Sequence, residues 1–129
     1  MSQLKILSAV IILAFMLPAC SRRTTVDQAP ELSVELEIVP APPRPGSSTL
    51  IIQISDENGT GLGELTLAVR GDMSHAGMGP ILVDAVTSAS SLYSVPFEWS
   101  MAGDWVLTIS STLADGRRLI RTLPVRVEP

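Results

Sequence analysis

Most of the chain after residue 30 alternates between apolar and polar residues with a period of two. In the segment 31–39, Leu32, Val34, Leu36 and Ile38 share one face while glutamates occupy the other. Successive side chains of a β-strand point to opposite faces, so this alternation predicts half-buried strands. The same pattern recurs in six further segments, at residues 48–55, 64–70, 81–86, 92–99, 104–113 and 117–127.

Turn signals separate these segments. Asp56 to Gly59 and the pair Asp115-Gly116 favour tight turns, and the four prolines between residues 40 and 46 exclude a central strand because they lack backbone donors. Pro96 interrupts the segment 92–99 on its polar face, which predicts an edge strand or a bulge. About seven short strands without any helical period predict an all-β domain.

The strand count favours an immunoglobulin-like antiparallel β-sandwich of about seven strands, with a small barrel as the alternative. About 95 residues are enough for one such core. Trp105 is the best candidate for the central aromatic residue of that core.

The first twenty residues follow a different pattern. An almost unbroken apolar run covers residues 6–17, too short to span a bilayer comfortably but typical of a signal peptide. The stretch Leu17-Pro18-Ala19-Cys20 then resembles the lipobox of bacterial lipoproteins. We therefore expect a signal peptide at 1–19, a lipidated N-terminus and flexible tether at 20–30, and a sandwich domain at 31–129. The alternative for Cys20, the single cysteine, is a free thiol.

This organisation predicts an extracytoplasmic, periplasmic lipoprotein anchored to the membrane by N-terminal lipid, since several acyl chains anchor stably. Ser21 resembles the outer-membrane sorting pattern of Gram-negative lipoproteins.

The charge balance narrows the class of partner. From Cys20 onward the chain has eight arginines, no lysine and thirteen acidic residues. This acidic balance argues against nucleic acid as a partner, because nucleic-acid binding needs a basic surface. Arg117, Arg118 and Arg121 flank the last predicted turn, where we expect a solvated, charge-balanced strand.

Candidate chemistry is concentrated between Gly71 and Pro80, which we expect to form a loop. Met73 and Met78 flank His75, the single histidine. Thioether sulfur and imidazole nitrogen together select Cu(I), and three such ligands suffice for a trigonal site. A bend at Gly77 would fold Met78 back toward the other two, because glycine tolerates the backbone angles needed.

Each of these residues has a plainer interpretation as well. The two methionines would plug the end of the core, and the histidine would be solvated. Met101 is a candidate fourth ligand if the loops meet, and otherwise a core residue. Asp72 is either a hydrogen-bond partner for His75 or a solvated carboxylate.

Three features in order carry a family resemblance. They are the turn Ile54 to Gly59 leading into 65–69, the Met-x-His-x-x-Met segment 73–78, and Tyr93-x-x-x-Phe97 followed by the block 101–107, Met-Ala-Gly-Asp-Trp-Val-Leu. Together they resemble the YtkA-like domain family, which is related to the FixH proteins. The resemblance implies an extracytoplasmic sandwich domain that handles copper, with a metal-transport or oxidase-assembly partner.

The functional prediction has two forms. The first is a lipid-anchored domain that binds or hands over Cu(I) through Met73, His75 and Met78. The alternative is a non-catalytic interaction module that docks a membrane partner through its strand edges or loop tip, without metal. No Cys–His or Ser–His–acid set is supported by the sequence, so we expect no enzymatic activity.

Overall fold

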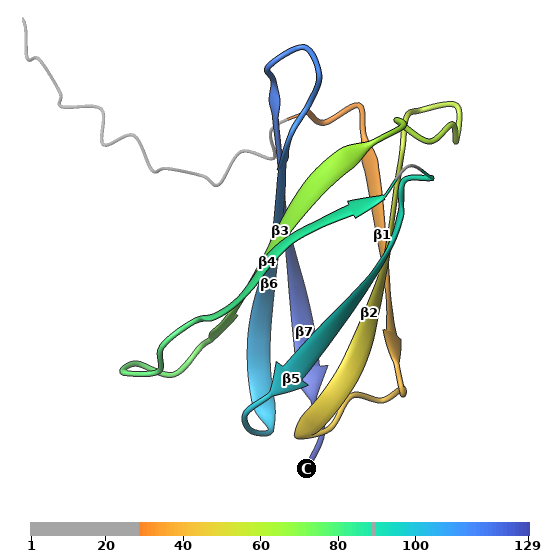
Figure 1. Ribbon diagram of the computed structural model, residues 1–129. Helices are drawn as coiled ribbons and strands as arrows, with labels where there is room; N and C mark the ends of the chain where they lie inside the picture. The colour runs from red at the N-terminus through yellow and green to blue at the C-terminus, as the bar shows by residue number, and fades with distance from the viewer. Residues whose placement is uncertain (1–28, 89) are drawn as a thin grey trace, which may run out of the picture.

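The computed structural model describes residues 29–88 and 90–129 (Figure 1). The predicted signal peptide, Cys20 and nearly all of the tether lie outside the described residues. No helix in the described part of the chain is long and apolar enough to cross a bilayer. The described chain forms seven strands: β1 (Ser33–Val39), β2 (Gly46–Ser55), β3 (Leu65–Met73), β4 (Ile81–Ser88), β5 (Leu92–Trp99), β6 (Gly103–Thr112) and β7 (Arg118–Val127).

The strands form two antiparallel sheets that pack face to face. One sheet has the order β1-β2-β5 and the other the order β4-β3-β6-β7. This confirms the predicted all-β sandwich of immunoglobulin-like type. In the constant-type immunoglobulin arrangement the fourth strand joins the sheet of the first two; here β4 pairs with β3 instead. The prediction for Pro96 is confirmed, because β5 is an edge strand.

The core lies between the sheets and is built mainly from the apolar faces of β2, β3, β5 and β6, while half-buried apolar side chains of β1 and β4 pack against it. On β5 the four residues Tyr93, Val95, Phe97 and Trp99 alternate with exposed neighbours and are all buried. Trp105 on β6 is buried as predicted, and its ring meets that of Trp99 edge-on with centroids 5.4 Å apart. The ring centroids of Phe97 and Trp99 lie 4.6 Å apart. These three rings fill one end of the sandwich.

Two buried polar groups in the core have opposite environments. The Trp99 indole Nε1 donates a hydrogen bond to Ser48 Oγ, 3.0 Å away. The Tyr93 hydroxyl makes no well-formed hydrogen bond to a described residue. Burial raises the pKa of Tyr93, and the nearby backbone of Leu65 offsets only part of that rise.

β3 is longer than the sequence predicted. It continues through Gly71 and Asp72 to Met73, because these residues pair with Leu107, Val106 and Trp105 of β6. The expectation that 71–73 belong to a loop was therefore wrong. The loop is confined to residues 74–80.

The side of the sandwich between β1 and β7 is tied at both ends. At one end, Arg121 turns inward and donates to the carbonyls of Ala29, 3.1 Å away, and Leu32. At the other end, the Glu128 N–H donates to the Pro43 carbonyl, 2.8 Å away. The expectation of a solvated Arg121 was wrong, since this half-buried guanidinium supplies donors to backbone carbonyls at the sheet edge.

The odd number of strands in the described part of the chain places its two ends, Ala29 and Pro129, at opposite ends of the sandwich. Because successive strands run in alternate directions, Ala29 lies near the β6–β7 turn, and the C-terminus lies at the opposite end (Figure 1). The β1–β2, β3–β4 and β5–β6 connections share that opposite end. The candidate loop 74–80 therefore lies far from the start of the described chain.

Candidate functional site

Met73 anchors the candidate loop to the sandwich. It is the last residue of β3, its half-buried side chain packs against the core, and its backbone pairs with Trp105. Its terminal methyl group lies against Gly103, where an added Cβ would approach to 2.7 Å. Gly103 has a φ of 140°, a backbone conformation that favours glycine. The Gly103 position thus makes room for the methionine.

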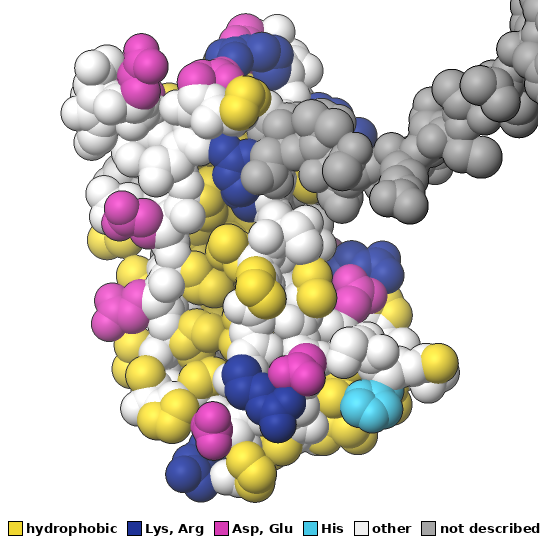
Figure 2. All heavy atoms as spheres, turned by 180° about the vertical axis from the view of Figure 1, so that it is seen from behind, with side chains coloured by type: hydrophobic (Ala, Val, Ile, Leu, Met, Phe, Trp, Pro, Cys, Tyr) yellow, Lys and Arg dark blue, Asp and Glu magenta, His cyan; other side chains and the backbone are white. Residues whose placement is uncertain are grey.

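The loop itself projects from the body of the sandwich (Figure 1). Ser74 holds its base, because both the N–H and the hydroxyl of Ser74 donate to the Asp104 carbonyl, at 3.1 and 3.2 Å. Gly77 has a φ of 88°, which confirms the predicted bend. His75 and Met78 are exposed beyond this base. Figure 2 shows the histidine on the surface at the margin of the molecule.

Met101 lies in the β5–β6 turn at the same end of the sandwich. Its side chain is 40 % exposed, so it does not pack in the core as one interpretation expected. Its carbonyl accepts a hydrogen bond from Trp105 Nε1, 3.1 Å away. The Ser74–Asp104 bonds join the candidate loop to the start of β6, directly after this turn. Met101 as a fourth ligand stays a prediction.

Asp72 is engaged elsewhere. Arg70, two residues earlier on the same face of β3, donates two hydrogen bonds of 2.7 Å to its carboxylate. The hydrogen bond from Arg70 lowers the pKa of Asp72, against a smaller opposing effect of burial. The suggested pairing of Asp72 with His75 was therefore wrong. The carboxylate serves an exposed ion pair on the strand.

No cluster of three His, Cys, Asp or Glu side chains suited to a metal ion occurs among the described residues. The soft donors at this end of the sandwich are the thioethers of Met73, Met78 and Met101 and the imidazole of His75. That donor set fits a soft, monovalent ion better than zinc or calcium.

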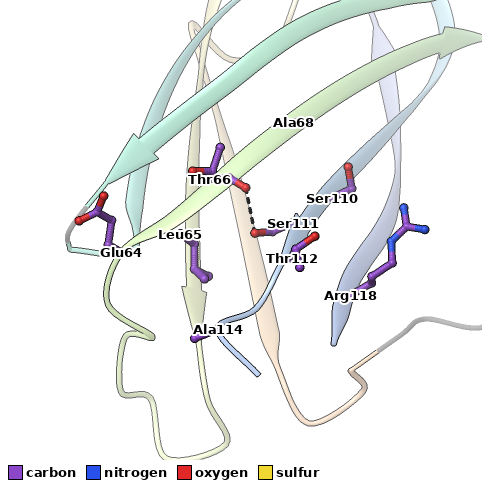
Figure 3. Close-up of a pocket in the computed structure, with 9 residues that line it drawn as sticks. All are labelled: Glu64, Leu65, Thr66, Ala68, Ser110, Ser111, Thr112, Ala114 and Arg118. Carbon is purple, nitrogen blue, oxygen red and sulfur yellow. Dashed lines mark hydrogen bonds between the residues drawn. The ribbon is translucent and has the colours of Figure 1, made fainter. Parts of the chain in front are cut away.

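A second feature was not predicted from the sequence. The outer face of the four-stranded sheet has a shallow hollow of about 400 Å³ near the β6–β7 end (Figure 3). It is lined by small and hydroxyl-bearing residues, with a carboxylate and a guanidinium among them: Glu64, Leu65, Thr66, Ala68, Ser110, Ser111, Thr112, Ala114 and Arg118. Ser111 Oγ donates to the Thr66 carbonyl and links β6 to β3 there, at 2.9 Å.

The hollow follows from side-chain size. Near the hollow, the outward positions of β3 and β6 carry Thr66, Ala68, Ser110 and Thr112, whose short side chains leave the sheet surface uncovered. The sequence pattern contained this signal, but only the register of β3 against β6 brings these positions side by side. Arg118 is exposed here, as predicted.

Comparison with known proteins supports the fold alone. No protein-family model matches the chain, and no curated protein sequence matches it. Among solved structures, the soluble domain of PmoD from Methylocystis sp. ATCC 49242 (Rockwell) is similar, with a TM-score of 0.52 and 12 % sequence identity. The match covers 75 % of this chain and 90 % of that chain. It agrees with a β-sandwich, while membership of the YtkA-like family stays a prediction.

Proposed function

We propose that this chain is a membrane-tethered, extracytoplasmic β-sandwich domain that binds Cu(I) and hands it to a partner. Met73, His75 and Met78 are the ligands, and Met101 is the candidate fourth. The observation that carries the proposal is the arrangement at the loop base. One soft donor is fixed against Gly103, and two exposed soft donors follow it within five residues, around a glycine bend.

The chemistry of handover fits this arrangement. Thioethers and a neutral imidazole bind Cu(I) without losing a strongly held proton. The nearest carboxylate on β3, Asp72, is occupied by Arg70 and does not compete for the ion. Exposed ligands on a projecting loop would be accessible to the ligands of a second protein, so the ion could move by exchange of one donor at a time.

Two sequence motifs of the proposed YtkA-like resemblance meet at this site. The block from Met101 to Trp105 provides Gly103, against which Met73 packs, and the carbonyl that holds the Trp105 indole. The Met/His segment and the block therefore form one structural unit. This contact supports the resemblance, and with it a metal-transport or oxidase-assembly partner and a non-catalytic role. Lipid on Cys20 would provide the tether.

A competition titration tests the metal site. The chain would be titrated with Cu(I) against a chromophoric chelator, using wild type, His75→Ala and the double variant Met73→Leu/Met78→Leu, which keeps the apolar volume while removing both sulfurs. Asp72→Asn is the matched control, because this residue is adjacent to the loop but paired with Arg70.

We expect both ligand variants to lose at least about tenfold in affinity, equivalent to about 1.4 kcal/mol, and the control to bind as wild type does. Equal binding by wild type and the double variant, or no binding by any of them at micromolar copper, would refute the site. Circular dichroism of each variant checks that the sandwich is intact.

The tether is tested separately. Cys20→Ser should abolish incorporation of labelled fatty acid and release the chain from membranes. Retention of the serine variant in the membrane fraction would contradict the lipoprotein assignment and leave the copper titration unaffected.

The second candidate function is a metal-independent interaction module. It is favoured by large apolar side chains that remain exposed on the described surface, foremost Leu82 at 65 %. A partner captured equally well with chelator present, and equally well by the Met73→Leu/Met78→Leu variant, would support this function over copper binding.

A further inference from the structure

The side of the sandwich between β4 and β5 is left open. Residues 81–84 of β4 make no hydrogen bond to β5 in the described part of the chain, in contrast to the side between β1 and β7, which is tied at both ends. Figure 1 shows β4 and β5 running apart from the connection that joins them. β4 and β5 are thus neighbouring edge strands of different sheets that are not paired with each other.

A hollow of about 310 Å³ lies on this open side. Its apolar lining comes from the edge strands of both sheets, and its remaining lining is polar or acidic: Ser47, Ser48, Ile81, Val83, Pro96, Phe97 and Glu98. The hollow therefore gives access to the rim of the core beside Phe97. It lies directly beside the free backbone edge of β4.

The four sheet edges differ in how they resist pairing with another strand. Proteins protect such edges with proline, charge or covering segments. The outward face of β1 carries Glu35 and Glu37, β5 contains Pro96, and β7 contains Pro124. β4 contains no proline, but it carries the exposed charge of Asp84 and an irregularity in its pairing with β3 between Val83 and Val86. Before these, it carries Leu82, the most exposed large apolar side chain among the described residues. Residues 81–83 of β4 therefore form a stretch of sheet edge that has neither proline nor charge.

We propose that β4 is a docking edge for an extended segment of a partner protein. The segment adds a strand to the free edge of β4 and extends the four-stranded sheet across the open side. Strand addition takes its affinity from main-chain hydrogen bonds and its specificity from alternate side chains. Here one set of alternate side chains enters the hollow beside Val83 and Phe97, and the other set lies beside Leu82.

The charges of the site indicate the chemistry of that segment. Asp84 is exposed on β4, and Glu98 lines the hollow, which has no basic residue in its lining. Arg70 of β3 lies opposite Leu82, but its guanidinium already donates two hydrogen bonds to Asp72. The chain as a whole carries a formal charge of −4. A segment that alternates apolar with basic residues complements both features. A second copy of this acidic chain complements the site less well. If two copies paired along β4, the Asp84 carboxylate of one copy would approach the Asp84 carboxylate of the other.

This site is independent of the proposed copper ligands, although it adjoins them. β4 begins at Ile81, immediately after the loop that carries His75 and Met78. A segment paired with β4 would therefore lie beside that loop. His75→Ala should weaken copper binding but not peptide binding to β4. A failure of the docking proposal can therefore be told apart from a failure of the copper site.

The test uses synthetic peptides of roughly ten residues, enough to span β4. The probe alternates valine and lysine. Three controls accompany it: the same peptide with N-methylated backbone amides, a valine–glutamate version, and a sequence-scrambled version. Binding to the ¹⁵N-labelled full chain in detergent would be followed by amide shifts and hydrogen exchange. Leu82→Lys is the test variant, and Val39→Lys, which changes an exposed valine at the end of β1, is the matched control.

We expect the valine–lysine peptide to shift and protect the amides of residues 81–84, with exchange slowed at least about tenfold at saturation. Leu82→Lys should weaken binding about tenfold or more, while Val39→Lys and His75→Ala bind as wild type does. The N-methylated, acidic and scrambled peptides should bind weakly or not at all.

Three results of the peptide experiment would overturn the proposal. They are no binding up to about 1 mM peptide, shifts centred on β1 or β7, and equal loss of binding in the two lysine variants. Concentration-dependent protection of residues 81–84 without peptide would also overturn it, because the occupant would then be a second copy of the chain.

Discussion

Gly71 provides a sharp test of how the core is packed beneath the candidate loop. It is a buried residue within β3, and a Cβ placed there would lie 2.5 Å from Cζ of Phe97. Ordinary carbon–carbon contacts are about 3.5–4.0 Å, so Gly71→Ala requires the ring to move by about 1 Å or more. The ring of Phe97 packs against Trp99, which in turn packs against Trp105, and these contacts oppose its movement on that side.

The expected cost follows from these contacts. Overpacking a well-filled core costs about 1–3 kcal/mol. Alanine recovers about 0.4–1 kcal/mol by restricting the unfolded chain, since Gly71 has no positive φ that alanine would oppose. We therefore expect Gly71→Ala to lower the free energy of unfolding by about 1–2 kcal/mol. Guanidinium unfolding, followed by the fluorescence of the two tryptophans, measures this loss.

A double-mutant cycle identifies the cause. Phe97→Leu removes the atom that the new methyl group meets, so the double variant should be more stable than the sum of the single effects predicts, by at least about 1 kcal/mol. Gly79→Ala is the control, because no atom lies within 4 Å of its added Cβ. A loss below about 0.5 kcal/mol for Gly71→Ala, or strict additivity with Phe97→Leu, would refute the packing argument.

Three further predictions concern single polar groups. Tyr93→Phe should leave stability unchanged or raise it by up to about 1 kcal/mol, because the buried hydroxyl it removes makes no well-formed hydrogen bond to a described residue; a loss above that size in urea unfolding would contradict this. Ser48→Ala should cost about 1–3 kcal/mol, since the buried Trp99 indole loses its acceptor, and thermal unfolding by circular dichroism measures it. Asp72, with its pKa held below the ordinary value by Arg70, contributes stability that is present above about pH 4 and lost as the pH falls through the lowered pKa. The difference between wild type and Asp72→Asn should therefore shrink on acidification, and a difference that grows instead would contradict the assignment.

The strands were predictable because burial on one face imposes a period of two. Leu50, Ile52 and Ile54 illustrate this: the sequence placed them on one face, and all three are fully buried. The extent of β3 was less accessible to sequence reasoning. Gly71 and Asp72 have low strand propensity, and pairing holds them in the strand: both pair with β6, and Gly71 also pairs with Ile81 of β4. Tertiary context decided this boundary.

The site was predictable in composition but not in geometry. The sequence shows three soft donors near each other, and the glycine bend follows from Gly77. It does not show that Gly103, thirty residues beyond Met73, provides the space for the methionine methyl group. Nor does it show that Arg121 faces inward, because a polar residue on a strand is expected to face solvent. Both facts depend on which segments the topology brings together.

The separation of the two ends of the sandwich has a consequence for how the protein can be handled. A strand of ten residues spans about 33 Å, so the loop lies roughly that far from the point where the chain enters the fold near Ala29. The candidate ligands therefore lie at the opposite end of the sandwich from Ala29, and a fluorophore attached beside Ala29 would leave them free. The C-terminus lies at the same end as the loop, so a bulky tag fused after Pro129 would crowd the loop and depress an otherwise normal copper titration.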